Sequence, residues 1–124
     1  MEEAANRKSI EVYLALLQKV TMDTFILTGL DNAGSKNARC MIELGYDTND
    51  VLNVLQDLTV QNYSQGPLPD KKGRPHDLWV FGKIIEGTQI YIKFTAFFEE
   101  NAVTAICVSF HEAEHEMNFP YKEA

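Results

Sequence analysis

The sequence predicts an α+β fold in which an antiparallel β-sheet of three or more strands carries N-terminal helices packed on one face. Two observations lead to this prediction. In the first half of the chain, apolar residues recur every three or four positions, as they do on the buried face of a helix. From Leu78 to His111, β-branched and aromatic residues alternate with small or polar ones and are interrupted by short turns, which is typical of strands.

The first predicted helix covers about Arg7 to Met22. One apolar stripe repeats along it, formed by Ile10, Tyr13, Leu14, Leu17 and Val20. The next apolar run, Phe25-Ile26-Leu27, is either a short strand or the end of this helix, and we favour a short extended segment.

Two more helices are predicted from their caps. After a turn at residues 32–35, Ser35 is a candidate N-cap for a helix that runs to Leu44 and ends at Gly45. Asp47 or Thr48 caps the third helix, which turns a stripe of apolar residues toward the sheet: Val51, Leu52, Leu55 and Leu58.

The segment that joins these helices to the strands reads as a loop. Residues 59–62 are expected to form one more turn, and the 13 residues between Tyr63 and Asp77 include three prolines and two glycines, so we expect no regular structure there. This loop also holds the densest cluster of positive charge. Such a cluster is most often a solvated surface, but in an acidic protein it is also the natural place for a phosphate to bind. Its members are therefore candidate RNA-binding residues: Lys71, Lys72, Arg74 and His76.

Strand register decides which side chains share a face. A two-residue turn at Glu86-Gly87 places Trp79 opposite Phe94 and Phe81 opposite Ile92. A three-residue loop at residues 99–101 then fixes three more pairs on the same apolar face: Ile106 with Phe94, Val108 with Ile92, and Phe110 with Ile90.

The opposite face of these strands is polar. It is predicted to carry Val80, Gly82, Tyr91, Lys93, Thr95, Cys107, Ser109 and His111. The small residues Gly82 and Ser109 are expected to flank Tyr91 and to leave its phenol reachable. We expect Phe119-Pro120-Tyr121, in the C-terminal tail, to fold back over an edge of the sheet.

Composition limits the class of protein. A chain of 124 residues fits one domain spanning residues 1–124. Its formal net charge of −7 argues against a generally basic nucleic-acid-binding surface, so any RNA site must be a local patch. Cys40 and Cys107 are expected to be buried, reduced thiols. With no apolar signal segment and no run long enough to span a membrane, we expect a cytoplasmic protein without a membrane partner.

Two readings of the histidines compete. Residues 111–115, HEAEH, satisfy the short zinc-protease pattern. That pattern requires a helix, whereas here it begins where a predicted strand ends. A zinc hydrolase is therefore a remote alternative, and we expect no metal or cofactor. In the other reading His111 is a general acid or base, since imidazole titrates near neutral pH. Lys93 would then balance the negative charge of a phosphorane, and Tyr91 would donate to a phosphate oxygen. Solvent-exposed polar residues are the ordinary alternative.

Several blocks, in order, carry a resemblance to a known family: LGYDTNDVLNVLQDLT, NYSQGPL, DLWVFGK, QIYIKF and CVSFHEAEHEMNFPYK. Over about residues 42–122 the chain resembles the MqsR (motility quorum-sensing regulator) family of type II toxins, and in particular a branch that ends in SFHxAEHxMxxP. The resemblance implies a RelE-like fold, a metal-independent ribonuclease that cleaves mRNA, and a cognate antitoxin as partner. In that reaction the 2′-hydroxyl attacks the adjacent phosphate.

The resemblance also implies site positions. The strand tyrosine of the founding member matches Tyr91 and the neighbouring lysine matches Lys93. Three further polar positions of the founding member differ: its lysine after the helix falls at Gln65, its glutamine after the tryptophan at Val80, and its lysine closing the last strand at His111. We expect His111 to replace that last lysine as acid or base, with His115 as a second titratable group.

Two function classes therefore stand at this point. The first is an RNA-cleaving toxin, which the family resemblance and the polar sheet face favour. The second is a binding module of the same fold without activity, which the acidic charge and the three changed positions favour.

Overall fold

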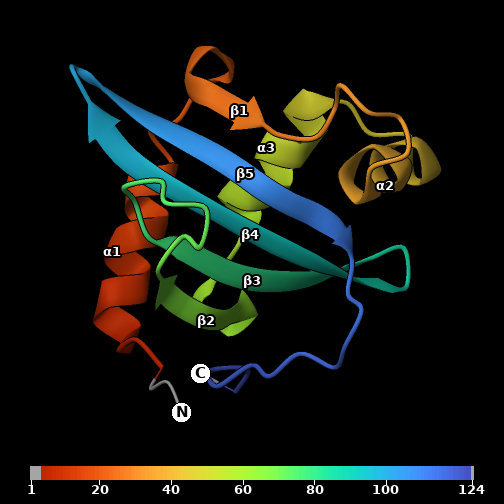
Figure 1. Ribbon diagram of the computed structural model, residues 1–124. Coiled ribbons are helices and arrows are strands. Elements are labelled where there is room, and N and C mark those ends of the chain that lie inside the picture. Colours follow the sequence, from red (N-terminus) through yellow and green to blue (C-terminus); the bar gives the residue numbers. More distant parts are fainter. Residues whose placement is uncertain (1–3, 124) are drawn as a thin grey trace.

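The protein is built on a five-stranded sheet with helices behind it (Figure 1). The computed structural model describes residues 4–123. Strand order across the sheet is β1-β5-β4-β3-β2, in which β1 runs parallel to β5 and the other neighbours are antiparallel. The strands are β1 (Phe25–Leu27), β2 (Tyr63–Leu68), β3 (Leu78–Ile85), β4 (Thr88–Glu99) and β5 (Ala102–Glu112). This architecture confirms the predicted α+β class, and it also confirms the extended conformation of Phe25-Ile26-Leu27.

The helices begin and end largely where their caps predicted. They are α1 (Arg7–Leu17), α2 (Lys36–Leu44) and α3 (Thr48–Asp57), with single 3₁₀ turns η1 (Met22–Thr24) and η2 (Val60–Asn62). Ser35 and Asp47 accept hydrogen bonds from backbone N–H groups of the first turns of α2 and α3, and Gly45 ends α2 with φ 70°. The first helix is shorter than predicted and ends at Leu17. The Gln56 side chain of α3 donates to the carbonyls of Leu17 and of Val20 in the turn that follows.

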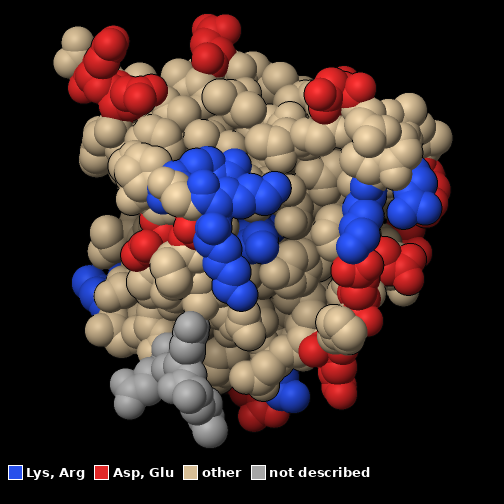
Figure 2. Space-filling model, viewed as in Figure 1, with Lys and Arg blue, Asp and Glu red and all other residues tan. Residues whose placement is uncertain are grey.

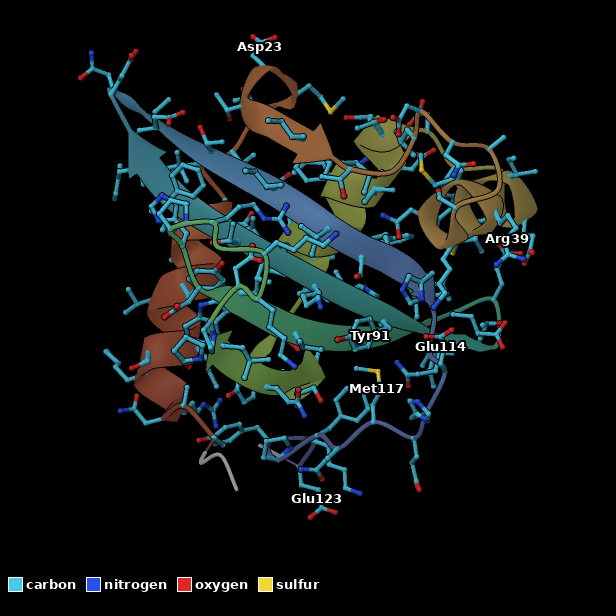
Figure 3. All side chains as sticks on the ribbon, in the orientation of Figure 1. Asp23, Arg39, Tyr91, Glu114, Met117 and Glu123 are labelled. Carbon is cyan, nitrogen blue, oxygen red and sulfur yellow. The ribbon has the colours of Figure 1, made fainter. Side chains whose placement is uncertain are left out.

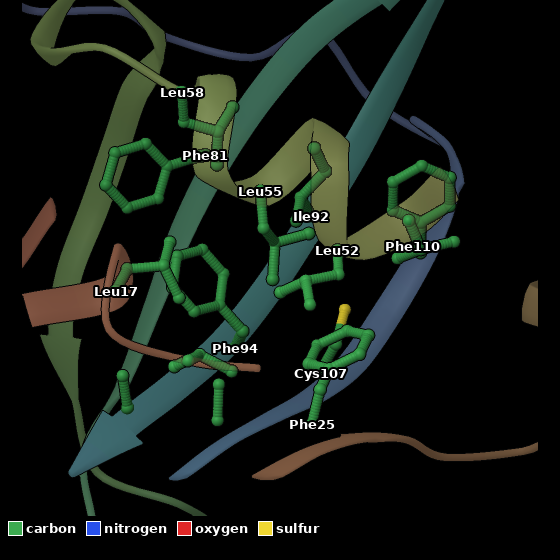
Figure 4. Close-up of a cluster of buried hydrophobic side chains, with 14 of the residues drawn as sticks. Leu17, Phe25, Leu52, Leu55, Leu58, Phe81, Ile92, Phe94, Cys107 and Phe110 are labelled. Carbon is green, nitrogen blue, oxygen red and sulfur yellow. The ribbon is translucent and has the colours of Figure 1, made fainter. Parts of the chain in front are cut away.

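The core lies between the sheet and the helices α1 and α3, which are behind the strands in Figure 1. Aromatic and aliphatic side chains of β3, β4 and β5 meet the leucines of these helices (Figure 4). The largest side chains there are fully buried, among them Leu17, Leu55, Phe81, Ile92, Phe94 and Phe110. The predicted burial of the Phe81/Phe94 face under helices is therefore confirmed. We call the opposite side of the sheet the open face.

The β3–β4 hairpin has the predicted register. Trp79 pairs with Phe94 and Phe81 with Ile92, and the turn consists of Glu86 (φ 50°) and Gly87 (φ 81°). Positive φ at both turn residues matches the twist of the two strands, which explains why this short turn fixes the register.

The β4–β5 register differs from the prediction. The turn has two residues, because Glu99 pairs with Ala102, and a β-bulge follows between the pairs Phe94–Cys107 and Lys93–Ser109. Cys107 therefore faces the core and is fully buried, which corrects its predicted place on the polar face. The two apolar residues predicted for the core, Ile106 and Val108, instead lie on the open face and are only partly buried.

The predicted loop between Tyr63 and Asp77 is wrong in its first part. Residues 63–68 form the edge strand β2, which pairs with β3 through two register shifts. An edge strand tolerates Pro67, which has no N–H to donate. Gly66 is required there, because it has φ 130° and a Cβ on it would lie 3.0 Å from the Cα atom of Trp79.

The C-terminal segment, residues 113–123, turns back from the end of β5, passes the β3–β4 hairpin and runs alongside the edge strand β2 (Figure 1). A Cβ on Gly82 would lie 2.8 Å from the Phe119 ring, so the absence of a side chain at Gly82 makes room for this segment. Ser64 Oγ donates to the Asn118 carbonyl and Tyr121 Oη donates to the Ala5 carbonyl. The expectation that the tail folds back on the sheet is confirmed. None of the helices within residues 4–123 has the length and apolarity that crossing a membrane requires.

Candidate active site on the open face

Two adjoining hollows form one groove across the open face. The larger, of about 810 Å³, lies between the sheet and the loop that joins β2 to β3, and the smaller, of about 470 Å³, lies between the sheet and the C-terminal segment. The two hollows share six lining residues: Ser64, Gln65, Tyr91, Lys93, Ser109 and Asn118. We refer to both hollows together as the groove.

Strand pairing brings three of the predicted catalytic residues together at the centre of the groove. Tyr91 is directly opposite His111, and their rings stack with centroids 5.6 Å apart and an interplanar angle of 24°. Lys93, two residues along β4, places Nζ 6.0 Å from the centre of the Tyr91 ring. A phenol, an ammonium and an imidazole therefore share one surface that no helix covers. The neighbours of Tyr91 are Gly82 and His111, which corrects the prediction of Ser109, because Ser109 pairs with Lys93.

The Tyr91 phenol is suited to donate a hydrogen bond. The side chain is half-buried, and this burial raises the pKa of Tyr91 above its ordinary value. The hydroxyl therefore keeps its proton at neutral pH. In Figure 3 Tyr91 lies on the open face, with Met117 and Glu114 of the C-terminal segment close by.

The His111 ring has one nitrogen engaged and one available. Its Nδ1 lies 3.0 Å from the Glu112 carbonyl oxygen. A carbonyl oxygen only accepts, so this contact places the hydrogen on Nδ1 of the neutral ring and leaves the lone pair on Nε2. Such a ring can accept a proton at Nε2 and later return it.

His115 lines the smaller hollow from the C-terminal segment. It is exposed, and the segment near it is tied to α2 by an ion pair of 2.7 Å between Lys36 Nζ and a Glu114 oxygen. The hydrogen bond from Lys36 and its positive charge lower the pKa of Glu114. His115 therefore lines the same hollow as His111, although His111 belongs to β5 and His115 to the segment that follows it.

The HEAEH segment does not have the shape that a zinc protease requires. Residues 111 and 112 end β5 and the rest form a bend, so His111 and His115 do not share a helix face. Within residues 4–123, no group of three or more His, Cys, Asp or Glu side chains is placed to hold a metal ion.

The loop between β2 and β3 supplies cations to the larger hollow. Lys71, Lys72 and Arg74 line it, and the Lys and Arg atoms gather over this loop in Figure 2 while acidic side chains lie mostly around the rim of the view. Asp70, whose side chain is 3% exposed, organises the loop by accepting from the Lys72 backbone N–H at 2.9 Å and from Arg74 Nε at 2.5 Å. The Lys72 hydrogen bond is the main cause of the lowered pKa of Asp70.

His76 does not join the other three candidate RNA-binding residues in the larger hollow. Its ring stacks on Phe97 with centroids 3.8 Å apart and an interplanar angle of 9°, and it lines a small neighbouring hollow of about 160 Å³. The sequence grouped it with the lysines because all four are close along the chain, but the loop turns it toward the end of β4.

The cysteines are not suited to be nucleophiles. Burial raises the pKa of Cys107 to about 12, and burial together with the neighbouring Glu43 and Glu112 raises the pKa of Cys40. Both thiols therefore stay protonated at neutral pH. Their burial confirms the sequence prediction for these two residues.

Asn37 is a residue that sequence analysis missed. Its side chain is buried in α2 and holds the β-bulge of β5: Oδ1 accepts from the Phe110 N–H at 2.8 Å, and Nδ2 donates to the carbonyls of Thr28 and Val108 at 3.0 and 3.2 Å. The bulge turns Ser109 and His111 to the open face, so Asn37 supports the site without lining it. A single polar residue in an amphipathic helix gives no signal of such a role.

The positions that the family resemblance implied also meet in the groove. Gln65 lines both hollows and pairs across strands with Val80, which lines the smaller one. Val80 is 1% exposed, so this position offers an apolar wall and no polar contact.

Comparison with known proteins gives one match. The sequence model of a family described as motility quorum-sensing regulator, toxin of MqsA, matches residues 12–112. The match begins in α1 and ends with the last residue of β5, so it includes the whole sheet. No curated protein and no solved structure matches the chain.

Proposed function

This chain belongs to the motility quorum-sensing regulator (MqsR) family of toxins, and we propose that it is an endoribonuclease that cleaves mRNA without a metal ion. The observation that carries the proposal is the meeting of Tyr91, Lys93 and His111 on neighbouring strands of a sheet face that no described helix covers, inside a groove that continues into a cationic loop. Each of these side chains has a role in cleavage by the RNA strand's own 2′-hydroxyl.

In the proposed reaction the 2′-oxygen attacks the adjacent phosphorus. An O2′–P bond forms, the P–O5′ bond breaks, and the products are a 2′,3′-cyclic phosphate and a free 5′-hydroxyl. His111 Nε2 takes the proton of the 2′-hydroxyl, or gives one to the leaving O5′, and His115 is the second titratable group at the same hollow.

The phosphorane is stabilised by the groups beside the imidazole. Lys93 Nζ supplies a positive charge, and the protonated Tyr91 hydroxyl donates to a phosphate oxygen. The ion pairs within residues 4–123 join Arg7 to Glu11, Lys36 to Glu114 and Arg74 to Asp70, so no carboxylate neutralises Lys93. Lys71, Lys72 and Arg74 would hold the phosphates that flank the scissile one.

A second candidate function is an RNA- or protein-binding module of the same fold that does not cleave. The specific observation that favours it is Val80, which presents a buried apolar surface at a position where the founding member has a glutamine. Gln65 likewise replaces a lysine, so the site would have lost one polar side chain and one positive charge.

Partners follow from the family. Its description names these proteins as toxins of MqsA, and we propose that a cognate antitoxin of that kind neutralises this chain in the cytoplasm. An acidic toxin with one cationic groove offers such a partner a single surface that must be covered to stop RNA from binding.

The test is incubation of the purified protein with RNA in EDTA, followed by analysis of the new ends. We expect cleavage that leaves 2′,3′-cyclic phosphates, a loss of about 100-fold or more in rate for His111→Ala, and a smaller loss for Tyr91→Phe. Tyr46→Phe is the matched control, because Tyr46 packs against Phe110 in the core and lies outside the groove.

The outcomes separate the alternatives. Binding of RNA without cleavage would favour the binding module, and activity that disappears in EDTA would restore a metal to the mechanism. If His111→Ala and Tyr91→Phe both kept the original cleavage rate, the assignment of the site would be wrong.

A further inference from the structure

A stacked pair of rings stands beside the groove and has no part in the proposed reaction. His76 lies face to face on Phe97, with ring centroids 3.8 Å apart. Phe97, near the end of β4, is partly buried on the open face, whereas His76 is exposed on the loop above it. The Phe97 ring therefore fixes the plane of the imidazole, and the other face of the imidazole is turned away from its support.

This pair is continuous with the phosphate-binding part of the groove. The small hollow of about 160 Å³ at His76 shares Arg74, Asp70, Leu78 and Val108 with the larger hollow. Arg74 uses Nε for its bond to Asp70, which leaves its terminal amino groups for a phosphate. Arg74 thus lines both the larger hollow and the small hollow at the stacked rings.

We propose that His76, supported by Phe97, is a stacking subsite for one unpaired base of the RNA strand whose phosphates lie on the cationic loop. This inference rests on the proposed function and deepens it by assigning base contact to a residue outside the reacting centre. Bases stack on flat side chains such as His with little dependence on sequence.

The surroundings favour a nucleic acid over a protein segment as the occupant. In a chain of net charge −7, this platform stands next to the one dense cluster of positive charge, at Lys71, Lys72 and Arg74. A polyanion that follows those cations is carried past His76. Imidazole over a phenyl ring also offers a flat, pre-oriented surface, which a base can cover without reordering the side chain.

The experiment compares two probes of the same length at one fixed salt concentration: a 2′-O-methyl heptauridylate and the matching abasic 2′-O-methyl ribose-phosphate chain. Neither probe can be cleaved by 2′-hydroxyl attack, so fluorescence anisotropy reports binding alone. For His76→Ala we expect about 10-fold weaker binding of the heptauridylate and less than about 2-fold change for the abasic chain. His76→Phe should keep the wild-type affinity for both.

Two controls separate stacking from charge and from folding. Lys72→Ala should weaken both probes by the same factor, because it removes a phosphate contact. Phe98→Ala, at a side chain that is 69% exposed on the opposite face of β4, should change neither. Thermal melts of all variants should coincide, since His76 and Phe98 are both exposed.

Equal losses on both probes for His76→Ala would show that the imidazole acts through charge, and this would overturn the inference. An unchanged affinity for the heptauridylate would also overturn it and leave the platform to a protein partner. Cleavage of a natural RNA is measured separately. If wild-type protein does not cleave but binds the heptauridylate in a His76-dependent way, the proposed nuclease activity fails while the stacking subsite stands.

Discussion

Replacement of Asn37 tests how the open face is held in place. Asn37→Ala removes three hydrogen bonds at once, those to the Phe110 N–H and to the carbonyls of Thr28 and Val108. These groups lie where β1, α2 and the bulge of β5 meet. The Asn37 side chain is buried, so water reaches the three backbone groups poorly after the substitution.

The magnitude follows from the number of bonds. At about 1 kcal/mol for each hydrogen bond, and somewhat more for a group left buried without a partner, we expect the free energy of unfolding to fall by about 2–4 kcal/mol. Asn37→Asp should be at least as damaging at pH 7, because a carboxylate would face the carbonyl oxygens of Thr28 and Val108. Both values are measured by urea unfolding followed by circular dichroism.

Asn53→Ala is the matched control, because Asn53 is exposed in the middle of α3. A change within about 0.5 kcal/mol is expected there. If Asn37→Ala cost no more than this control, strand pairing alone would hold the bulge, and the role assigned to Asn37 would be refuted.

Gly82→Val is expected to detach the C-terminal segment, because the new Cβ would lie 2.8 Å from the Phe119 ring. Limited proteolysis should then cut after residue 113 sooner than in the wild type. An unchanged digest would contradict this prediction. Cys40 and Cys107 should resist a thiol reagent at pH 8 in the folded protein and react fully in urea, because burial raises the pKa of both thiols. Rapid labelling of either thiol without urea would disprove this expectation. The hydrogen bond that we propose from Tyr91 to a phosphate oxygen should persist until the pH exceeds about 10, the ordinary pKa of a tyrosine, because burial raises the pKa of Tyr91 above that value. A fall in cleavage rate near pH 9 that Tyr91→Phe abolishes would refute this.

The sequence was sufficient for the β3–β4 hairpin but not for the next one. Glu86-Gly87 suits only a short turn with positive φ, so one register followed. Residues 99–101 permit a loop of two or three residues, and the β-bulge has no signature, because Ile106, Cys107 and Val108 are all compatible with a core position. Pattern alone cannot choose between such neighbours.

The side chains of Phe110 and His111 nevertheless lie on the predicted faces of the sheet, for a physical reason. The shorter turn shifts β5 by one residue against the prediction, and the bulge shifts it by one more. Side chains alternate with a period of two, so two shifts restore the predicted faces beyond the bulge. Phe110 and His111 therefore point as predicted, while Ile106 and Cys107, before the bulge, are exchanged.

The sequence alone could not predict the edge strand β2 or the stacking of His76 on Phe97, for a different reason. Both depend on contacts between distant segments: Gly66 against the backbone of Trp79, and His76 on Phe97. Local composition at residues 63–77 favours a loop, and only the sheet that forms elsewhere in the chain converts its first part into a strand.

The acidic balance of the chain and a role on RNA are compatible because the charges are segregated. Lys93 and the loop cations line one groove, while the net charge of −7 belongs to the protein as a whole. In the larger hollow four cations, Lys71, Lys72, Arg74 and Lys93, line the wall with one carboxylate, Asp70, and this excess of positive charge favours a polyanion there. On the proposed function, an RNA strand would then be held at few phosphates and in one direction of approach. Contacts to bases, such as the one proposed at His76, gain importance when phosphate contacts are few, because they add affinity that salt does not screen.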